Sequence, residues 1–484
     1  MKFWRKLLSS GQSVCNSIAF GDVIQIQDVD GEVTVIAQEP PPYRIETLSV
    51  AAATLSSDHA RAQPSRLLLP RYRAVPFTGR KAELAQVTNW LDTNKAMTVR
   101  LLHAAGGHGK TRLAQQVAAQ AAGGGWTLWR VIHAATPAPN TRMELPAGGR
   151  LLVVVDYADR WPVSDLAAFH THLNDLCQRT GIRVRALLLA RSAGSWWPAL
   201  SAGLDSDHGI EATARVLPPL DNTVDRAQLY RDARQHFAAT MDIRGTDNLP
   251  LPVTLTDDAF GQILAVHMAA LVAVDAYRHG TTPPVAPHAL SAYLLIRERT
   301  HWHKLYARKM EPIKTAPTVM GRAVFVATLT GALPYSDARS ALHAATVAQH
   351  DVDTVIDEHH FCYPPQDADT VLEALHPDRL GEDLIALSIP GHPYTDGDDA
   401  WTPDPLAKTA ATNLLTTQTT PPIWTPTAVT VLVETARRWP HVATEVLYPL
   451  IWQRPDLALN AGGATLTRLA DLPDINPAVL ELVV

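Results

Sequence analysis

The eight residues AAGGHGKT, from Ala104 to Thr111, constrain the fold of this chain more than any other feature. An apolar run from Met97 to His103 comes directly before them, and a segment with helical character begins at Arg112. This order of strand, glycine-rich loop and helix is what a phosphate-binding loop requires, because the loop N–H groups and the helix N-terminus face the phosphates. We therefore expect an ATP- or ADP-binding α/β domain.

The residues of this loop have separate expected roles. Lys110 should bridge the β- and γ-phosphates, and the Thr111 hydroxyl should bind Mg²⁺. Ala104 replaces the first glycine of the motif, which restricts the backbone but removes no N–H donor, so binding is still expected. The residues expected to contact the nucleotide are Ala105, Gly106, Gly107, His108, Gly109, Lys110, Thr111 and Arg112.

A second apolar run, Leu151 to Val155, ends at Asp156. On its own such a run would be an ordinary core strand, but after a phosphate loop its terminal carboxylate suits the Mg²⁺ shell. The next residue is Tyr157, where fast ATPases often have a glutamate that orients the attacking water. We expect Asp159 to orient the attacking water instead, and we predict slow turnover of ATP.

A third run, Val184 to Ala190, ends at Arg191. Ligands of doubly wound sheets bind at the carboxyl ends of the strands, so Arg191 is a candidate to sense the γ-phosphate. The residue pattern alone supports equally well an arginine that only forms a salt bridge with a neighbour.

A fourth strand-like run covers 126–132. Such runs alternate with helical segments from about Val75, and helices dominate beyond about Leu217. This pattern predicts an α/β P-loop NTPase with a parallel sheet and helices on both faces, followed by further helical modules. Two segments within 317–390, namely 361–363 and 384–389, have the character of short strands. The expected units are a β-hairpin arm (1–45), a linker (46–72), the P-loop ATPase core (73–216), an α-helical lid (217–316), a winged-helix-like module (317–390), a Pro/Thr-rich connector (391–427) and α-helical C-terminal hairpins (428–484).

Composition limits the other partners. The net charge of −6 over 484 residues is small and spread along the chain, so we do not expect nucleic acid to be a partner. The 3 cysteines are far apart and do not form a CxxC motif. No apolar run approaches the roughly 20 residues that cross a bilayer. We expect a cytoplasmic protein with no membrane span.

Together these segments resemble the STAND class of signal-transducing P-loop ATPases, which is related to AAA+ proteins and to NB-ARC and NACHT modules, and they are similar to the multidomain actinobacterial type. The resemblance spans roughly Pro76 to Ile389. The residues that carry it are PFTGRKAEL (76–84), GGHGKTRLA (106–114), VVVDYAD (153–159) and LLLAR (187–191).

The resemblance implies further roles. It places Phe77, Gly79 and Arg80 around the base, gives Arg191 the sensor role, and points His376 at the ADP β-phosphate. A helix N-cap on Asp378 would explain the residues around His376 equally well. Where the family has Gly-x-Pro in the lid, this chain has GQI (261–263), so that adenine contact is missing a proline.

The function that the resemblance implies is a switch with slow, Mg²⁺-dependent ATP hydrolysis. It would be closed with ADP and open with ATP, and it would form a homo-oligomer to signal in defence or regulation, with a separate effector or sensor protein. One alternative is an ATP-regulated, DNA-associated regulator, which the acidic stretch 367–383 opposes. The other is a nucleotide-binding scaffold without turnover.

Overall fold

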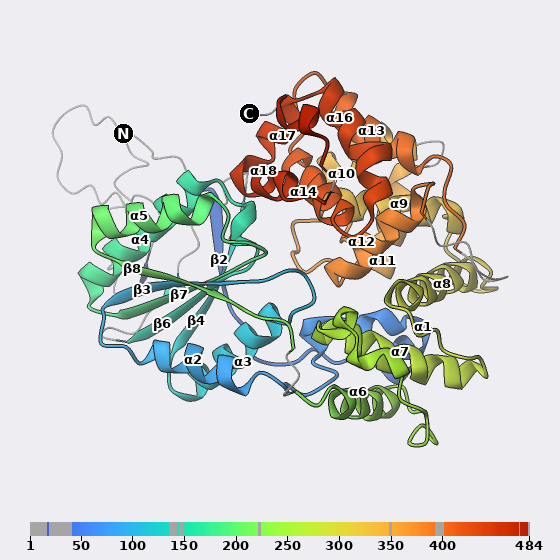
Figure 1. Ribbon diagram of the computed structural model, residues 1–484, viewed down its shortest axis with the longest axis horizontal. Coiled ribbons are helices and arrows are strands. Elements are labelled where there is room, and N and C mark those ends of the chain that lie inside the picture. The colour runs from blue at the N-terminus through green and yellow to red at the C-terminus, as the bar shows by residue number, and fades with distance from the viewer. Residues whose placement is uncertain are drawn as a thin grey trace, which may run out of the picture.

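The computed structural model describes residues 17–18, 41–134, 143–144, 149–220, 224–347, 351–392, 401–473 and 475–482. The two strands predicted for the hairpin arm, within 23–36, lie outside these residues. Figure 1 shows a sheet with helices on both sides, next to two groups of helices formed by the middle and the end of the chain.

The main sheet has six strands in the order β2-β4-β6-β7-β3-β8. The strands predicted from their apolar runs are present as β3 (Met97–His103), β4 (Thr127–His133), β6 (Arg150–Val155) and β7 (Arg183–Ala190), and all of them run parallel. Two edge strands were not predicted: β8 (Glu211–Val216), parallel to β3, and β2 (Tyr43–Thr47), antiparallel to β4. A short antiparallel pair joins β1 (Ser17–Ile18) to β5 (Met143–Glu144).

Helices cover both faces of this sheet, as expected. In Figure 1, α2 (Lys81–Leu91) and α3 (Lys110–Gly123) lie on one face, and α4 (Val163–Thr180) and α5 (Trp196–His208) lie on the other. Alternation along β7 explains why both faces are apolar: Leu187 and Leu189 belong to the core with α2 and α3, whereas Ala186 and Leu188 belong to the core with α4 and α5.

The segment 46–72, expected to be a linker, has secondary structure of its own. It contains α1 (Ser57–Ala62) and the 3₁₀ turns η2 (Pro64–Leu68) and η3 (Pro70–Tyr72). Ala60 and Leu67 are buried in the helical core, and the side chains of Gln63 and Ser65 donate hydrogen bonds to the buried Glu298. Tertiary packing thus orders a stretch that has weak periodicity of its own.

The helical part begins with α6 (Arg226–Thr240), α7 (Ile263–His279) and α8 (Pro287–Tyr306). After them come α9 (Pro317–Thr330), α10 (Tyr335–Ala344), α11 (Val352–Cys362) and α12 (Asp378–Ser388), with an antiparallel bridge between Leu333 and Val371. The short strands expected at 361–363 and 384–389 are wrong, because these residues lie at the end of α11 and within α12. α12 packs against α8, α9 and α14, so nearly its whole circumference is buried. A helix buried on all sides can contain an apolar run, here 384–389, that looks like the run of a buried strand.

The last part of the chain is helical, as expected. It consists of α13 (Ala407–Thr416), α14 (Thr425–Ala436), α15 (Pro440–Val442), the π-helical turn η7 (Ala443–Leu447), α16 (Tyr448–Gln453), α17 (Asp456–Asn460), α18 (Gly462–Ala470) and α19 (Pro477–Leu480). In the part of the chain that the structure describes, none of the helices has both the length and the apolar character needed to span a membrane.

Close packing around Gly381 in α12 leads to a stability prediction. A Cβ atom there would lie 2.6 Å from the Leu375 carbonyl oxygen and 2.8 Å from Thr328 Cγ2. We expect Gly381→Ala to lower the free energy of unfolding by about 1–3 kcal/mol, measured by urea denaturation. Gly203→Ala in α5 is the matched control, because its nearest neighbour is 4.0 Å away and a helical alanine should stabilise. Equal effects of the two substitutions would contradict this packing.

Candidate functional site: the phosphate loop and its surroundings

The phosphate loop connects β3 to α3 with the geometry that the sequence predicted. Gly107 and Gly109 have φ angles of 82° and 91°, a region in which glycine is favoured. Ala104, in contrast, does not have a positive φ, and its N–H donates to the Ala190 carbonyl at 3.2 Å. Alanine is therefore tolerated at the first position of the motif without loss of a loop donor.

Lys110 is the first residue of α3, and its side chain folds back over the loop. Its Nζ donates to the carbonyl oxygens of Ala104 at 2.6 Å and of Ala105 at 3.1 Å. Burial and the nearby Arg191 lower the pKa of Lys110 to about 8, so the amine is still mostly protonated at neutral pH. A cation held against loop carbonyls can turn towards an incoming phosphate without a new backbone conformation.

Thr111 and Asp156 meet at the carboxyl edge of the sheet. Thr111 Oγ1 donates to Asp156 Oδ2 at 2.9 Å, and the Tyr157 N–H donates to the other carboxylate oxygen at 2.9 Å. Burial raises the pKa of Asp156. A hydroxyl and a single carboxylate fit Mg²⁺, which is held by one or two protein oxygens together with phosphate oxygens and water. The ion would neutralise phosphate charge there, and Thr111 and Asp156 are the residues that would hold it.

Asp159 lies beside this pair, on the short turn η4 (Ala158–Arg160). Its Oδ2 accepts a hydrogen bond from the Arg191 N–H at 2.9 Å, whereas its buried Oδ1 has no hydrogen-bond partner among the residues that the structure describes. A buried acceptor without a partner costs free energy unless another donor reaches it, and a water molecule is one such donor. His103, which the sequence reasoning missed, also lies here: burial and Lys110 lower its pKa, so its ring is neutral.

The entry motif contacts the loop from the other side. Arg80 is 4% exposed, pairs with Glu83 at 2.8 Å and donates to the His108 carbonyl at 3.3 Å. Gly79 has a φ of 80°, and a Cβ there would lie 3.5 Å from Leu229 of α6. Phe77 packs, half-buried, against the core with α2 and α3. Of the three predicted base-pocket residues, Arg80 thus contacts the phosphate loop directly.

The start of α7 covers the loop where the missing proline was expected. The Leu264 N–H donates to the Gly107 carbonyl at 3.2 Å, and a Cβ on Gly109 would lie 3.3 Å from Ile263 Cγ2. Arg112 anchors the other end of the loop by donating to the Val75 carbonyl at 2.6 Å. The start of α7 therefore contacts the loop through Ile263 and Leu264 rather than through a proline.

Arg191 is held by carboxylates from helices far along the chain. Its guanidinium lies 2.6 Å from Asp378 and 2.7 Å from Glu382, both in α12, and 2.9 Å from Glu434 in α14. Arg191 is only 7% exposed, and although burial alone would lower its pKa, these carboxylates raise it well above its usual value. In this conformation Arg191 therefore forms salt bridges with three carboxylates, which is the second of the two roles that the sequence left open.

The same cluster extends to the neighbouring arginines. Arg438 pairs with Glu382 and Asp383, and Arg468 of α18 pairs with Glu434. α18 also packs on the loop after β7, where a Cβ on Gly463 would lie 3.0 Å from Ser195 Oγ. The C-terminal helices therefore close over the edge of the sheet at which nucleotides bind in this class of fold.

His376 does not point at the phosphate loop. Its ring nitrogens lie 3.2 Å from Asp378 and 3.4 Å from Glu373; burial would lower its pKa, but these two carboxylates raise it to about 9. Asp378 is the first residue of α12 and makes no capping hydrogen bond, so the N-cap alternative is wrong. Instead, Asp378 accepts a hydrogen bond from the Tyr157 hydroxyl at 2.9 Å. The Asp378 side chain thus links His376 to Tyr157, which follows β6 at the carboxyl edge of the sheet.

Comparison with known proteins adds little to this geometry. No protein-family model matches the chain, and no curated protein sequence matches it. Three of the solved structures similar to it are the ORC2 protein of Aeropyrum pernix in its ADPNP-ADP complexes (14% identity, 64% of this chain and 96% of that chain, TM-score 0.27), Cdc6p from Pyrobaculum aerophilum (13%, 72% and 96%, 0.30) and Drosophila ORC bound to DNA (10%, 80% and 96%, 0.26).

At these TM-scores the similarity carries no argument, and the fold rests on the sheet order and the loop described above. The resemblance to the STAND class therefore stays a prediction. The DNA belongs to the Drosophila structure, and the expectation that this chain has no nucleic-acid partner gains no support from it.

Proposed function

We propose that this protein is an ATP-binding switch that hydrolyses ATP slowly with Mg²⁺ and is closed through Arg191. The observation that carries the proposal is the position of Arg191. It lies at the nucleotide edge of the sheet, beside a formed phosphate loop and the Thr111–Asp156 pair, yet its guanidinium is bound by Asp378, Glu382 and Glu434.

A γ-phosphate would compete with these carboxylates for the same guanidinium. The negative charge of the γ-phosphate, which ADP lacks, would thus favour a conformation in which the carboxylates of α12 and α14 release Arg191. A nucleotide shifts such an equilibrium only by its difference in affinity for the two states, and the γ-phosphate supplies that difference here. Lys110 and the loop N–H groups bind both nucleotides, so they set affinity rather than the choice of state.

In the proposed hydrolysis each residue has a limited task. Lys110 and the loop hold the phosphates, Thr111 and Asp156 hold Mg²⁺, and the free Oδ1 of Asp159 accepts a hydrogen bond from the attacking water. The Oδ2 of Asp159 is already used by the Arg191 N–H, which fixes the direction of the carboxylate. Fast ATPases often have a glutamate directly after the residue that corresponds to Asp156, and here Asp159 on the turn η4 takes its task. Because this carboxylate comes from a different position, we expect slow turnover.

Charge removal in α12 tests the switch. Glu382→Gln leaves the shape of the side chain but removes one of the three charges on Arg191, so we expect faster release of bound ADP and roughly 3- to 10-fold faster ATP turnover, a factor that corresponds to about 1 kcal/mol. The readouts are stopped-flow release of a fluorescent ADP and steady-state phosphate production.

Glu445→Gln is the matched control. Glu445 pairs with Lys408 at 2.9 Å in the same C-terminal helices, but that pair is exposed and remote from Arg191. Unchanged rates in Glu382→Gln, or equal changes in both variants, would count against the switch.

Neither alternative function is favoured by the described residues. α12, the last helix of the winged-helix-like module, is buried from Arg379 to Ser388, so it presents no face to DNA in this conformation. A scaffold without turnover differs from the switch only in its rate of phosphate release, which the same assay measures. Assembly with further copies in the ATP state is part of the proposal, and sedimentation with each nucleotide tests it.

A further inference from the structure

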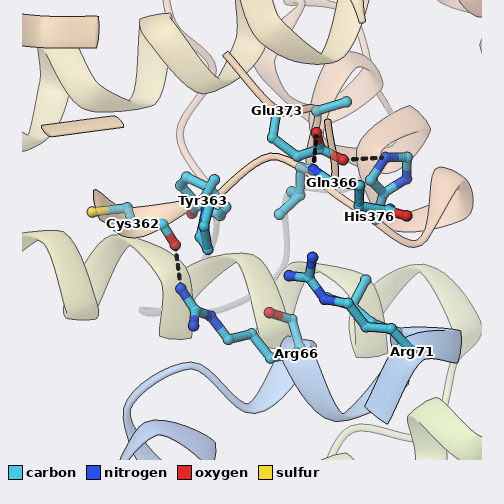
Figure 2. A pocket seen from close by; sticks show the side chains of 12 residues that line it. Arg66, Arg71, Cys362, Tyr363, Gln366, Glu373 and His376 are labelled. Carbon is cyan, nitrogen blue, oxygen red and sulfur yellow. Dashed lines mark hydrogen bonds and ion pairs between the residues drawn. The ribbon is translucent and has the colours of Figure 1, made fainter. Parts of the chain in front are cut away.

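A pocket separate from the phosphate loop lies between the N-terminal segment and the loop that leads into α12. Its floor is formed by η2 and η3, and its roof by residues 362–366 and 373–376 (Figure 2). About 390 Å³ of space free of protein atoms lies within it, a figure that includes open solvent at its mouth. Of the residues assigned to nucleotide binding, only His376 lines it.

Arg71 is the pocket residue with a buried side-chain donor that the described residues leave without an acceptor. Its Nε is buried and has no hydrogen-bond partner in the described part of the chain, and its guanidinium carbon lies 5.1 Å from the centre of the Tyr72 ring. Figure 2 shows this guanidinium pointing away from η3, towards the roof loop with Gln366. A buried guanidinium donor without an acceptor costs free energy, and two oxygens of one anion would satisfy it.

The other charged groups around the pocket leave room for an anion. Arg66 donates to the Cys362 carbonyl, and His376 carries a positive charge at neutral pH because its carboxylate partners raise its pKa to about 9. The one carboxylate in the lining, Glu373, is already occupied by His376 at 3.4 Å and by the Gln366 N–H at 3.4 Å.

The remaining groups near the pocket do not compete for Arg71. Burial raises the pKa of the Cys362 thiol to about 12, so this thiol is neutral. Glu298, behind the pocket, accepts hydrogen bonds from Gln63, Ser65 and Tyr363. No carboxylate of the described residues forms an ion pair with Arg71 within the structure.

We propose that this pocket binds a phosphate group, with Arg71 as its main ligand and Arg66 and His376 as further cationic neighbours. The parallel N–H groups of the Arg71 guanidinium can donate to two phosphate oxygens at once. Cations on the floor and on the roof of the pocket suit a tetrahedral anion better than a planar carboxylate. A bound phosphate would join η3 to the loop before α12. The binding claim stands whether or not the proposed switch is correct.

Titration calorimetry with inorganic phosphate, at constant ionic strength, tests the proposal. The Lys110→Ala protein is the background, because it removes the lysine of the phosphate loop. We expect this protein still to bind one phosphate, and Arg71→Gln in the same background to bind it roughly 10- to 100-fold more weakly, the loss expected for a charge-assisted, two-point contact.

Arg73→Gln is the matched control, because it removes the same charge two residues away from a side chain outside the lining. Arg71→Lys keeps the charge and should lose only part of the affinity, which separates a lost fork from misfolding. The proposal is overturned if the Lys110→Ala protein binds no phosphate, if Arg71→Gln binds it as well as Arg73→Gln does, or if malonate binds more tightly than phosphate.

Discussion

Replacing Asp156 with Asn is expected to reduce Mg²⁺-dependent ATP turnover by about 100- to 1000-fold, the range found when one preorganised electrostatic group is removed from an active site. Asp156 is the carboxylate next to the Thr111 hydroxyl, at 2.9 Å. Asparagine keeps the shape and can still accept the Thr111 hydrogen bond, but it lacks the negative charge that holds Mg²⁺. Phosphate release, measured with and without excess Mg²⁺, gives the result.

The fold should survive this change, because burial raises the pKa of Asp156 and the substitution removes a desolvated charge. The unfolding midpoint of Asp156→Asn should therefore not fall below that of the wild type. Asp175→Asn, an exposed position on α4, is the control that should keep full turnover. Full turnover in Asp156→Asn would mean that the ion is held elsewhere.

Removing the Arg191 side chain is expected to have the largest effect on stability. Arg191→Ala leaves Asp378, Glu382 and Glu434 facing one another without their shared cation, at side-chain exposures of 19%, 8% and 6%. Breaking a buried ion pair on one side costs about 3–5 kcal/mol, because the remaining charge keeps its desolvation cost. We expect a loss of this size in urea denaturation followed by tryptophan fluorescence.

Two comparisons make the Arg191 result specific. Lys408→Ala breaks the exposed pair with Glu445, and it should change the free energy of unfolding by at most about 1 kcal/mol. Combining Arg191→Ala with Glu382→Gln should recover part of the loss, because one of the three carboxylates that face one another loses its charge. If Arg191→Ala is no more destabilising than Lys408→Ala, the carboxylate cluster does not hold the C-terminal helices on the sheet.

The centre of the sheet was predictable because its signals are local. β3, β6 and β7 are apolar runs buried on both faces, and a polar residue ends or directly follows each of them at the carboxyl edge of the sheet. Edge strands lack this signal. β8 is largely exposed, and β2 pairs with the sheet on one side only, so neither has an apolar run long enough to stand out.

The surroundings of Arg191 could not be predicted, because they depend on contacts between distant segments. The sequence left open whether this arginine senses phosphate or forms a salt bridge, and its partners Glu382 and Glu434 come from separate helices with no shared motif. α12 shows the same limit: packing on all sides gives it an apolar run that local pattern alone cannot distinguish from a strand. Arg71 offers no sequence signal, because only the fold shows that its Nε is buried without an acceptor among the described residues.

The central claim, that the loop from Ala104 to Thr111 binds nucleotide, is tested most directly by titrating Mg²⁺ with ADP or ATP into the wild type and into Lys110→Ala by calorimetry. We expect one nucleotide per wild-type chain and an affinity at least about 100-fold lower for Lys110→Ala, since a charge-assisted contact to two phosphates is lost. Absence of binding in the wild type, or equal affinity in both proteins, would contradict the claim.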